Sequence, residues 1–482
     1  MVRPWVKLGG AVAAAVLAWM YMACLVRISE NASGDLVQLG SVTDSTAKIW
    51  LFSTAASDVH ISYTSWEHGK AVPEKTSAAF SGVHPALTVS LRNLRPSTAY
   101  TVNVTLVNGT QPTPLHAVTF QLKTLGPDMT RVHFAFGSCT MAIPFVYPIT
   151  GFGDNLNFIA TTLRPDFVLL LGDQVYADVD VARDTEQLYR TTVHDPQYVA
   201  LGHTTPLFSI YDDHEIRNDV RVVHIDGVNS TLFKWNAMSF SPPSSDPLYA
   251  ARLPLYDAYF GQRNPDPLEP SEHYYTWTTG VASFFMLDVR KYASPKADID
   301  GPAKTKLGAI QKAHLLRWLR AAPPSSFKVV ISSMVVSDYG LQATDEGWAT
   351  YKTEYLEIVT FVQTRNISGV VLLSGDLHFA GVWRHTPFEF LYEIGASPIA
   401  AIPVPPLYPV TTTHTQLFRS WTGLHFGHVD IHHVPNDDAT SSLVMDVTIF
   451  RHRVVGVPSS AFHLRLRWED TIPSRMMLRH IK

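Results

Sequence analysis

The feature of this chain that most constrains its fold is a set of apolar runs that end in side chains able to bind metals or carry protons. The clearest is FVLLLGDQVYAD at 167–178, which leads into Asp173 and Asp178. The same form recurs in RVHFAFGSC at 131–139, LFSIYDDHE at 207–215 and GVVLLSGDLH at 369–378. Such runs are typical of buried parallel strands, and open α/β sheets bind ligands beyond the carboxyl ends of these strands. Because packing alone has no use for carboxylates at strand ends, the pattern predicts a metal-dependent hydrolase.

Length and composition are those of a globular protein. The 482 residues allow two or three domains, with 46% hydrophobic and 17% charged residues. The 38 basic and 42 acidic residues leave a net charge of -4. Because no basic stripe is present, we expect no surface for nucleic acid.

The N-terminal segment is of a different kind. Residues 8–26 carry no charge, follow Arg3 and Lys7 and precede Arg27. The segment is long enough to cross a bilayer, so we predict a transmembrane signal anchor within residues 1–30. A cleaved signal peptide or a lipobox ending at Cys24 are the alternatives, but Tyr21 and Met22 are bulky where cleavage requires small residues. The positive residues before the span predict a single-pass membrane protein whose catalytic domain is lumenal or extracellular, in the secretory pathway or at the cell surface.

Glycosylation sequons agree with that location. An acceptor Asn with Ser or Thr two places later occurs at Asn31, Asn103, Asn108, Asn229 and Asn366. With Cys24 in the apolar span, Cys139 has no partner for an intrachain disulfide. Its sulfur is therefore either inertly buried or bound to something else.

Two folded regions are expected after the anchor. From 35 to 125, short alternating stretches predict a small β-sandwich, and LRNLRPSTAY at 91–100 resembles the tyrosine corner of fibronectin type III domains. From 130 to 455, strands alternate with amphipathic segments at 307–322 and 351–366, which predicts a layered α/β domain, followed by a tail at 456–482. Most aromatic residues between 235 and 280 are expected to pack in the interior.

The residue types at the strand ends indicate two unlike metals. Asp173 is the candidate to bridge them. Oxygen donors that suit calcium, magnesium or manganese are Asp178, Asp213, Asn218, Asp376 and, as an open alternative, Asp212. Cys139 and Tyr176 would supply thiolate and phenolate, which suit a ferric ion better. His214 and His378 could be ligands or proton carriers.

Five ordered blocks carry a resemblance to a known family. They are FGSCT at 136–140, GDQVYAD at 172–178, DDHEIRND at 212–219, LDVRKY at 287–292 and SGDLHFA at 374–380. Together they resemble the PhoD-like alkaline phosphatases of the calcineurin-like metallophosphoesterase superfamily. The resemblance implies a two-sheet sandwich flanked by helices, preceded by a fibronectin type III-like domain.

It also implies a phosphoester substrate, cleaved as monoester or diester by a metal-activated hydroxide, and a binuclear or larger site of ferric iron and calcium. By this resemblance Cys139, Asp173 and Tyr176 surround the iron, while Asp213, Asn218 and Asp376 serve calcium. His214 would stabilise the reacting phosphate or protonate the leaving oxygen, and Arg290 would bind phosphate oxygens.

Several points stay open at this stage. The superfamily has a further His after its fourth strand, which VVISSMVVSD at 329–338 lacks; His425 or His428 could substitute for it. Asp178 could be a ligand or a helix cap. Other divalent metals could fill the site. A phosphodiesterase or phospholipase acting on lipid headgroups, and a surface-binding protein without catalysis, are the alternative functions.

Overall fold

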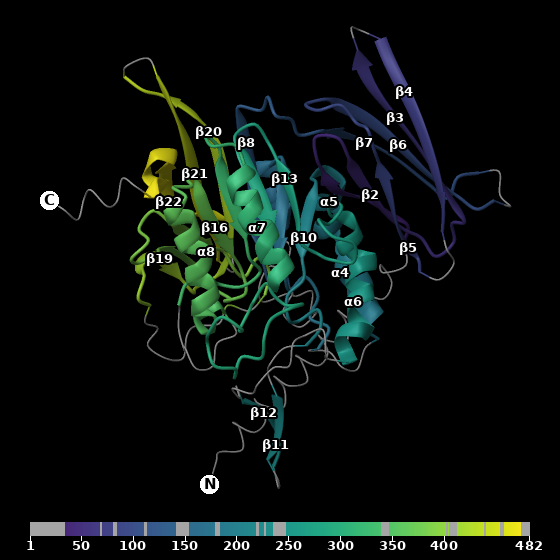
Figure 1. Ribbon diagram of the computed structural model, residues 1–482. Helices are drawn as coiled ribbons and strands as arrows, with labels where there is room; N and C mark the ends of the chain where they lie inside the picture. The colour runs from purple at the N-terminus through teal and green to yellow at the C-terminus, as the bar shows by residue number, and fades with distance from the viewer. Residues whose placement is uncertain are drawn as a thin grey trace.

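The architecture is mixed α/β and rich in sheet (Figure 1). The computed structural model describes residues 34–67, 70–80, 84–109, 113–140, 154–178, 184–217, 221–225, 228–234, 247–338, 347–401, 403, 412–437, 440–453 and 457–473. The chain forms an N-terminal β-sandwich and a larger part built on two sheets.

Two antiparallel sheets form the N-terminal sandwich. The three-stranded sheet has the order β1(Leu36–Val42), β2(Ala47–Phe52), β5(Ala86–Leu91). The four-stranded sheet has the order β4(Lys70–Ala79), β3(Asp58–Glu67), β6(Ala99–Val107), β7(His116–Lys123). In β6 buried residues alternate with more exposed ones, as the sequence pattern predicts for a strand with one face on a core. The Tyr100 hydroxyl accepts the N–H of Arg95 at 2.9 Å, so the expected tyrosine-corner bond is present.

The larger part contains a six-stranded and a seven-stranded sheet. The first has the order β10(Leu207–Ile210), β9(Phe167–Leu171), β8(Arg131–Gly137), β20(Leu424–Pro435), β21(Ser441–His452), β22(Ser459–Arg467). The second has the order β13(Tyr275–Thr278), β14(Ala282–Met286), β15(Phe327–Ile331), β16(Val370–Ser374), β18(Tyr392–Gly395), β17(Ala380–Arg384), β19(Thr415–Ser420). Strands β8, β9 and β10 are parallel, as are β14, β15, β16 and β18. The two expected sheets are thus present. A separate hairpin pairs β11(Arg221–Ile225) with β12(Val228–Lys234).

Aromatic residues pack the two sheets against each other. The centre of the Phe284 ring on β14 lies 5.5 Å from the ring centres of Phe134 on β8 and Phe167 on β9. All three side chains are fully buried. The outer face of the seven-stranded sheet is covered by α7(Ala309–Ala321) and α8(Lys352–Thr364), whose bounds agree within two residues with the predicted segments (Figure 1). This burial on both faces explains why the central strands read as continuous apolar runs.

A layer of short helices connects the sandwich to the larger part (Figure 1). Its members are α3(Asp154–Phe158), the π-helical turn η1(Ile159–Leu163), α4(Thr185–Val193), α5(Pro196–Thr204), α6(Pro247–Tyr259) and the turn η3(Gly261–Arg263). Trp50 on β2 donates its indole N–H to the Ala258 carbonyl at 2.9 Å, and the buried Arg263 guanidinium lies 3.7 Å from the centre of the Trp50 ring. These contacts bury the face of β2 that points away from the sandwich core against the helical layer.

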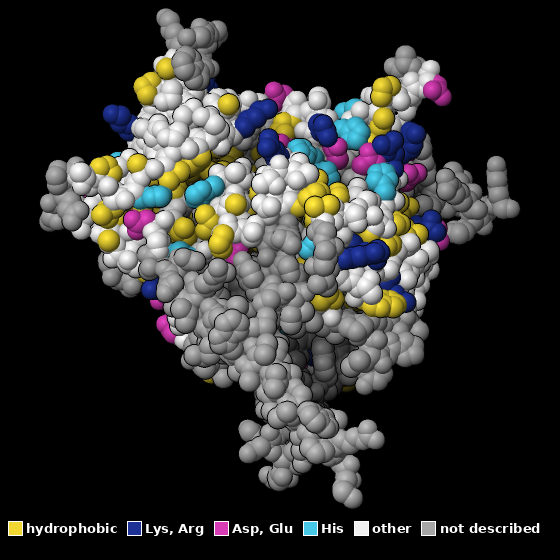
Figure 2. All heavy atoms as spheres, turned by 180° about the vertical axis from the view of Figure 1, so that it is seen from behind, with side chains coloured by type: hydrophobic (Ala, Val, Ile, Leu, Met, Phe, Trp, Pro, Cys, Tyr) yellow, Lys and Arg dark blue, Asp and Glu magenta, His cyan; other side chains and the backbone are white. Residues whose placement is uncertain are grey.

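The predicted tail contains part of a sheet. Residues 459–467 form β22, which pairs with β21 along most of its length, and the turn η5(Trp468–Thr471) follows. On the face opposite that of Figure 1, basic, acidic and His side chains are interspersed (Figure 2). Ion pairs join neighbouring strands of the six-stranded sheet, such as Arg131 to Asp430 at 2.7 Å and Arg465 to Asp446 at 2.7 Å.

The localisation predicted from residues 8–26 needs correction. Within the ranges given above, no helix has the length and apolar character needed to cross a bilayer. The predicted span and the rest of residues 1–30 lie outside those ranges. The expectation of a transmembrane helix, and of a single-pass protein with a lumenal or extracellular catalytic domain, is therefore not retained.

Candidate metal centre

Four aspartates meet where β9, β10 and β16 end. Asp173, Asp212, Asp213 and Asp376 each offer a carboxylate oxygen, and these oxygens all lie within 4.8 Å of one another. The first three side chains are buried and Asp376 is half-buried. The parallel neighbours β9 and β10 deliver Asp173, Asp212 and Asp213 at one edge of the six-stranded sheet, and β16 of the seven-stranded sheet brings Asp376 to the same place.

A second group of donors shares Asp173 with this cluster. Ligand atoms of Cys139, Asp173 and His378 also lie within 4.8 Å of one another. The Cys139 thiol is 3.4 Å from Asp173 Oδ2, and the Tyr176 hydroxyl is 3.0 Å from His378 Nε2. Asp173 therefore joins an all-carboxylate group to a group with sulfur, nitrogen and phenol donors, which is the position expected of a bridging ligand.

His214 stands beside both groups with its ring orientation fixed. One ring nitrogen lies within 4.8 Å of oxygens of Asp173 and Asp213, and Nδ1 is 2.8 Å from Asp178 Oδ1. Asp178 thus contacts an imidazole, a partner that neither of the alternatives left open for it, metal ligand or helix cap, had included. A carboxylate on Nδ1 sets the tautomer and leaves Nε2 as the nitrogen for proton transfer.

Arg290 faces the acidic cluster. Its Nε lies 2.5 Å from Asp212 Oδ1, and its terminal nitrogen Nη2 lies 3.2 Å from Asp213 Oδ1. Ser333, just beyond β15, also donates to Asp212 Oδ1 at 2.9 Å. Asp212 is therefore engaged with a cation and a hydroxyl.

The backbone is strained at four of these residues. Cys139, Asp173, Asp376 and His378 have φ values of 62°, 57°, 71° and 51°. Non-glycine residues rarely adopt this left-handed conformation, and they cluster at functional sites when they do. Gly172, with φ 93°, precedes Asp173, and a Cβ at this position would lie 2.5 Å from that of Asp212. Only glycine lets the end of β9 approach Asp212 so closely.

Glu215 is a site residue that the sequence reasoning missed. Its Oε2 accepts the N–H groups of Asp173 at 3.1 Å and Asp212 at 2.8 Å. Its Oε1 accepts those of Gln174 at 2.6 Å and Val175 at 3.1 Å. The side chain is fully buried. One carboxylate thus fixes both ligand-bearing loops, and the only signal in the sequence was an acidic residue within DDHE that had no assigned partner.

The electrostatics show an excess of negative groups. Burial raises the pKa of the Asp173 carboxyl well above its ordinary value, and Asp213, Asp212 and Glu215 raise it further. Burial also raises the pKa values of the Cys139 thiol and the Tyr176 phenol. Burial opposes charge on His214, but Asp213, Asp173 and Asp178 outweigh it and hold its pKa well above the usual value. Closely spaced acidic groups of this kind favour the binding of cations.

The donor set fits two metals. Asp173 Oδ1 and Asp212 Oδ2 are buried oxygens with no hydrogen-bond partner in the described part of the chain. Buried carboxylate oxygens normally have partners, so these two are suited to bind cations. Soft and phenolic donors gather on one side of Asp173, and hard oxygen donors on the other.

Most of the predicted site residues are brought together. The residues that converge are Cys139, Asp173, Tyr176, Asp213, His214, Arg290, Asp376 and His378. Asn218 lies outside the described residues. His425 contacts the Ser420 hydroxyl at 2.9 Å and His428 contacts His133 Nδ1 at 3.4 Å, and neither belongs to a candidate metal group of the described residues.

The predicted glycosylation sites are placed as follows. Asn103 and Asn366 are exposed, and Asn108 is half-buried. Asn229 lies in β12, and Asn31 falls outside the described residues. Their modification stays a prediction.

Comparisons with known proteins agree with this geometry. A family model described as PhoD-like phosphatase matches residues 134–415. Alkaline phosphatase D of Bacillus subtilis (strain 168) is 22% identical over 350 residues, which cover 61% of this chain and 56% of that protein. The chain therefore matches a little over half the length of this relative. A solved structure described as "Structure of PhoD" aligns with a TM-score of 0.63 and 18% identity over 90% of both chains. This similarity shows that the two chains share a fold.

Proposed function

Because the chain belongs to the PhoD-like phosphatase family, we propose that it is a metal-dependent hydrolase of phosphoric esters. The observation that carries the proposal is that Asp173 belongs to both groups of candidate metal ligands. Arg290 and His214, whose ring is hydrogen-bonded to a carboxylate, lie beside these groups. Chance packing does not account for such a set.

We assign the metal ligands by donor chemistry. Cys139, Asp173 and Tyr176 would hold ferric iron, with His378 next to Tyr176. Asp173, Asp213 and Asp376 would hold calcium, and Asn218 is proposed to join them. Bound metals would supply Lewis acidity that lowers the pKa of water and neutralises phosphoryl oxygens.

The side chains of the site have defined tasks in this proposal. Arg290 binds phosphoryl oxygens through its planar guanidinium. Water attacks phosphorus, the bond from phosphorus to the leaving oxygen breaks, and His214 passes its Nε2 proton to the departing alkoxide. The proton that the attacking water loses passes to solvent, from which His214 is protonated again. Asp178 holds the protonated imidazole through Nδ1 during this transfer. The products are the phosphate and the free alcohol.

The test is hydrolysis by the purified full chain of a chromogenic phosphate monoester and of the matching diester. We expect turnover of at least one, a loss of about 100-fold in Asp173→Asn, and a large loss in Cys139→Ser. Asp446→Asn removes a carboxylate paired to Arg465 outside the site and serves as the control. Full activity in both site variants would refute the proposal, while preference for the diester would identify a phosphodiesterase.

A further inference from the structure

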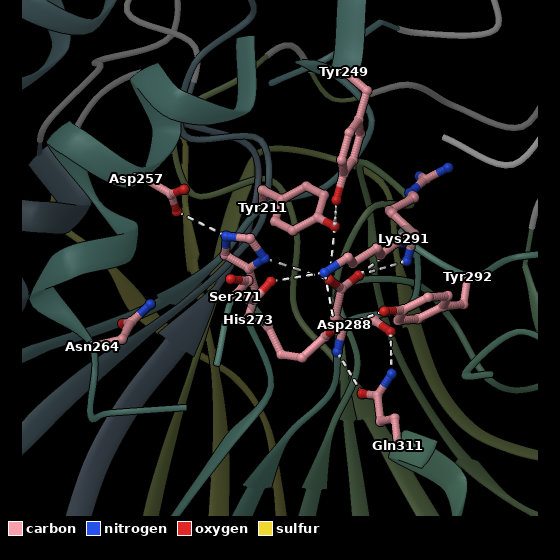
Figure 3. Close-up of polar contacts among 12 residues, drawn as sticks. Tyr211, Tyr249, Asp257, Asn264, Ser271, His273, Asp288, Lys291, Tyr292 and Gln311 are labelled. Carbon is pink, nitrogen blue, oxygen red and sulfur yellow. Dashed lines mark hydrogen bonds and ion pairs between the residues drawn. The ribbon is translucent and has the colours of Figure 1, made fainter. Parts of the chain in front are cut away.

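The turn that carries Arg290 is closed by a buried aspartate. Strand β14 ends at Met286, and two residues later the Oδ1 of Asp288 accepts the N–H groups of Arg290 and Lys291, both at 3.0 Å. Figure 3 shows Asp288 and Lys291 of this turn. Asp288 is 1% exposed. Its carboxylate therefore determines where the main chain of Arg290 lies.

The other oxygen of Asp288 reaches the opposite side of the site. Asp288 Oδ2 accepts the Tyr211 hydroxyl at 2.7 Å (Figure 3). Tyr211 directly precedes Asp212 and Asp213, the two carboxylates that the Arg290 guanidinium contacts. The Asp288 carboxylate thus joins the main chain of the arginine to the main chain of its acidic partners.

We propose that Asp288 and Tyr211 are positioning residues that set the Arg290 guanidinium for a phosphoryl group. This inference rests on the proposed function, because it assumes that Arg290 binds phosphate. Neither residue needs to touch the substrate. A binding group must be held within about 0.5 Å of its productive position, and a long arginine side chain meets that requirement only if its base is fixed.

Asp288 is itself held from two sides (Figure 3). Gln311 of α7 accepts the N–H of Asp288 at 2.9 Å and donates to its carbonyl at 2.7 Å. His273 Nδ1 lies 3.9 Å from Asp288 Oδ2, while His273 Nε2 lies 2.8 Å from Asp257 Oδ1. Burial opposes charge on His273, but Asp257 and Asp288 hold its pKa above the usual value. Asp288 is thus fixed at its main chain by Gln311 and lies beside the His273 ring.

A pair of tyrosine variants separates positioning from stability. Tyr211→Phe removes the hydroxyl that binds Asp288, and Tyr275→Phe removes a buried hydroxyl that donates to the Ser209 carbonyl on β10 at 2.8 Å. The two changes delete the same atom at equally buried sites near the same strand. Only the Tyr211 hydroxyl connects to the main chain of Arg290, through Asp288.

The readouts are KM for the chromogenic ester, the inhibition constant of inorganic phosphate, and the metal content of the full chain. Tyr211→Phe should raise KM and the inhibition constant about 3- to 10-fold with unchanged metal content, and Tyr275→Phe should not. In an Arg290→Ala background Tyr211→Phe should add no further change. Asp288→Asn, which keeps one acceptor oxygen, should be milder than Asp288→Ala.

The outcomes distinguish the inference from the proposed function. If Arg290→Ala weakens phosphate binding but Tyr211→Phe behaves like Tyr275→Phe, the inference is wrong and the function stands. If Arg290→Ala leaves the inhibition constant of phosphate unchanged, the phosphate-binding role of Arg290 is itself wrong. A Tyr211→Phe effect that persists in the Arg290→Ala background would also overturn the inference.

Discussion

The Cys139 thiol lies 3.4 Å from Asp173 Oδ2 although 34 positions separate the two residues in the chain. The contact exists because β8 and β9 are parallel neighbours whose carboxyl ends meet at one edge. Hydroxyl groups of Ser397 and Ser138 lie 3.1 and 3.3 Å from the same sulfur. The sulfur thus has hydrogen-bonding groups around it that are suited to a thiolate ligand.

Glu215→Gln should release metal more readily and unfold more easily. The amide keeps one acceptor oxygen and directs an NH₂ group at two main-chain donors, which leaves them unsatisfied in the interior. We expect a loss of about 2 to 3 kcal/mol in the free energy of unfolding, with faster loss of metal to a chelator.

Glu354→Gln is the matched control. Glu354 is also buried and accepts the N–H groups of Lys306 and Leu307, away from the candidate metal groups. Both of these N–H groups bond to Oε2, so the amide oxygen can keep them, and the variant should lose less stability than Glu215→Gln in urea titrations and retain metal like the parent. Equal metal loss in both variants would contradict a specific role for Glu215.

Tyr176→Phe should reduce activity by at least about 10-fold and alter the visible absorption of the iron-loaded protein. The change removes the phenol oxygen that lies 3.0 Å from His378 Nε2 and that we assign to iron. Tyr198→Phe is the control, since its buried hydroxyl has no hydrogen-bond partner among the described residues. An unchanged spectrum in Tyr176→Phe would remove this residue from the ligand set.

His273 should make the folding stability depend on pH. Its folded-state pKa is raised, so its contribution is fully present below about pH 6.5 and is lost as the pH rises through the folded pKa. The stability difference between the parent and His273→Asn should therefore shrink over that interval in urea titrations.

His203→Asn should show the opposite trend. Burial lowers the pKa of His203, so protonation favours the unfolded chain, and the parent should lose stability relative to this variant as the pH falls below about 6.5. If both variants gave the same pH trend, the raised pKa of His273 would be wrong.

Trp50→Leu should destabilise the protein by about 3 kcal/mol. The fully buried indole donates to Ala258 and stacks with the Arg263 guanidinium, so its loss leaves a cavity and a less stabilised buried cation between the sandwich and the helical layer. Trp421→Leu, at a half-buried indole beside Arg419, should cost about 0.5 kcal/mol or less. Thermal unfolding of both variants checks this, and equal effects would contradict it.

The sequence predicted the parts of the fold and site that depend on local pattern. Strand β6 alternates between buried and more exposed residues and so shows the period of a strand with one buried face. Strand β1 is buried along its whole length and β4 carries Pro73 at a sheet edge, so neither shows that period in its sequence. Cys139, Asp173 and Asp376 were found because each interrupts an apolar run.

Glu215 and Asp288 were not assigned, because their partners are main-chain N–H groups of turns, and spacing in the sequence does not reveal these. The contact of Asp178 with His214 likewise required the three-dimensional arrangement.

Metal analysis of the parent, Asp173→Asn and Asp446→Asn, purified as full chains, tests the central claim most directly. Because Asp173 joins the two ligand groups, the account predicts iron and an alkaline-earth metal in the parent and in Asp446→Asn, and a loss of both from Asp173→Asn. Undiminished content of both metals in Asp173→Asn, or a parent chain that binds neither, would contradict it.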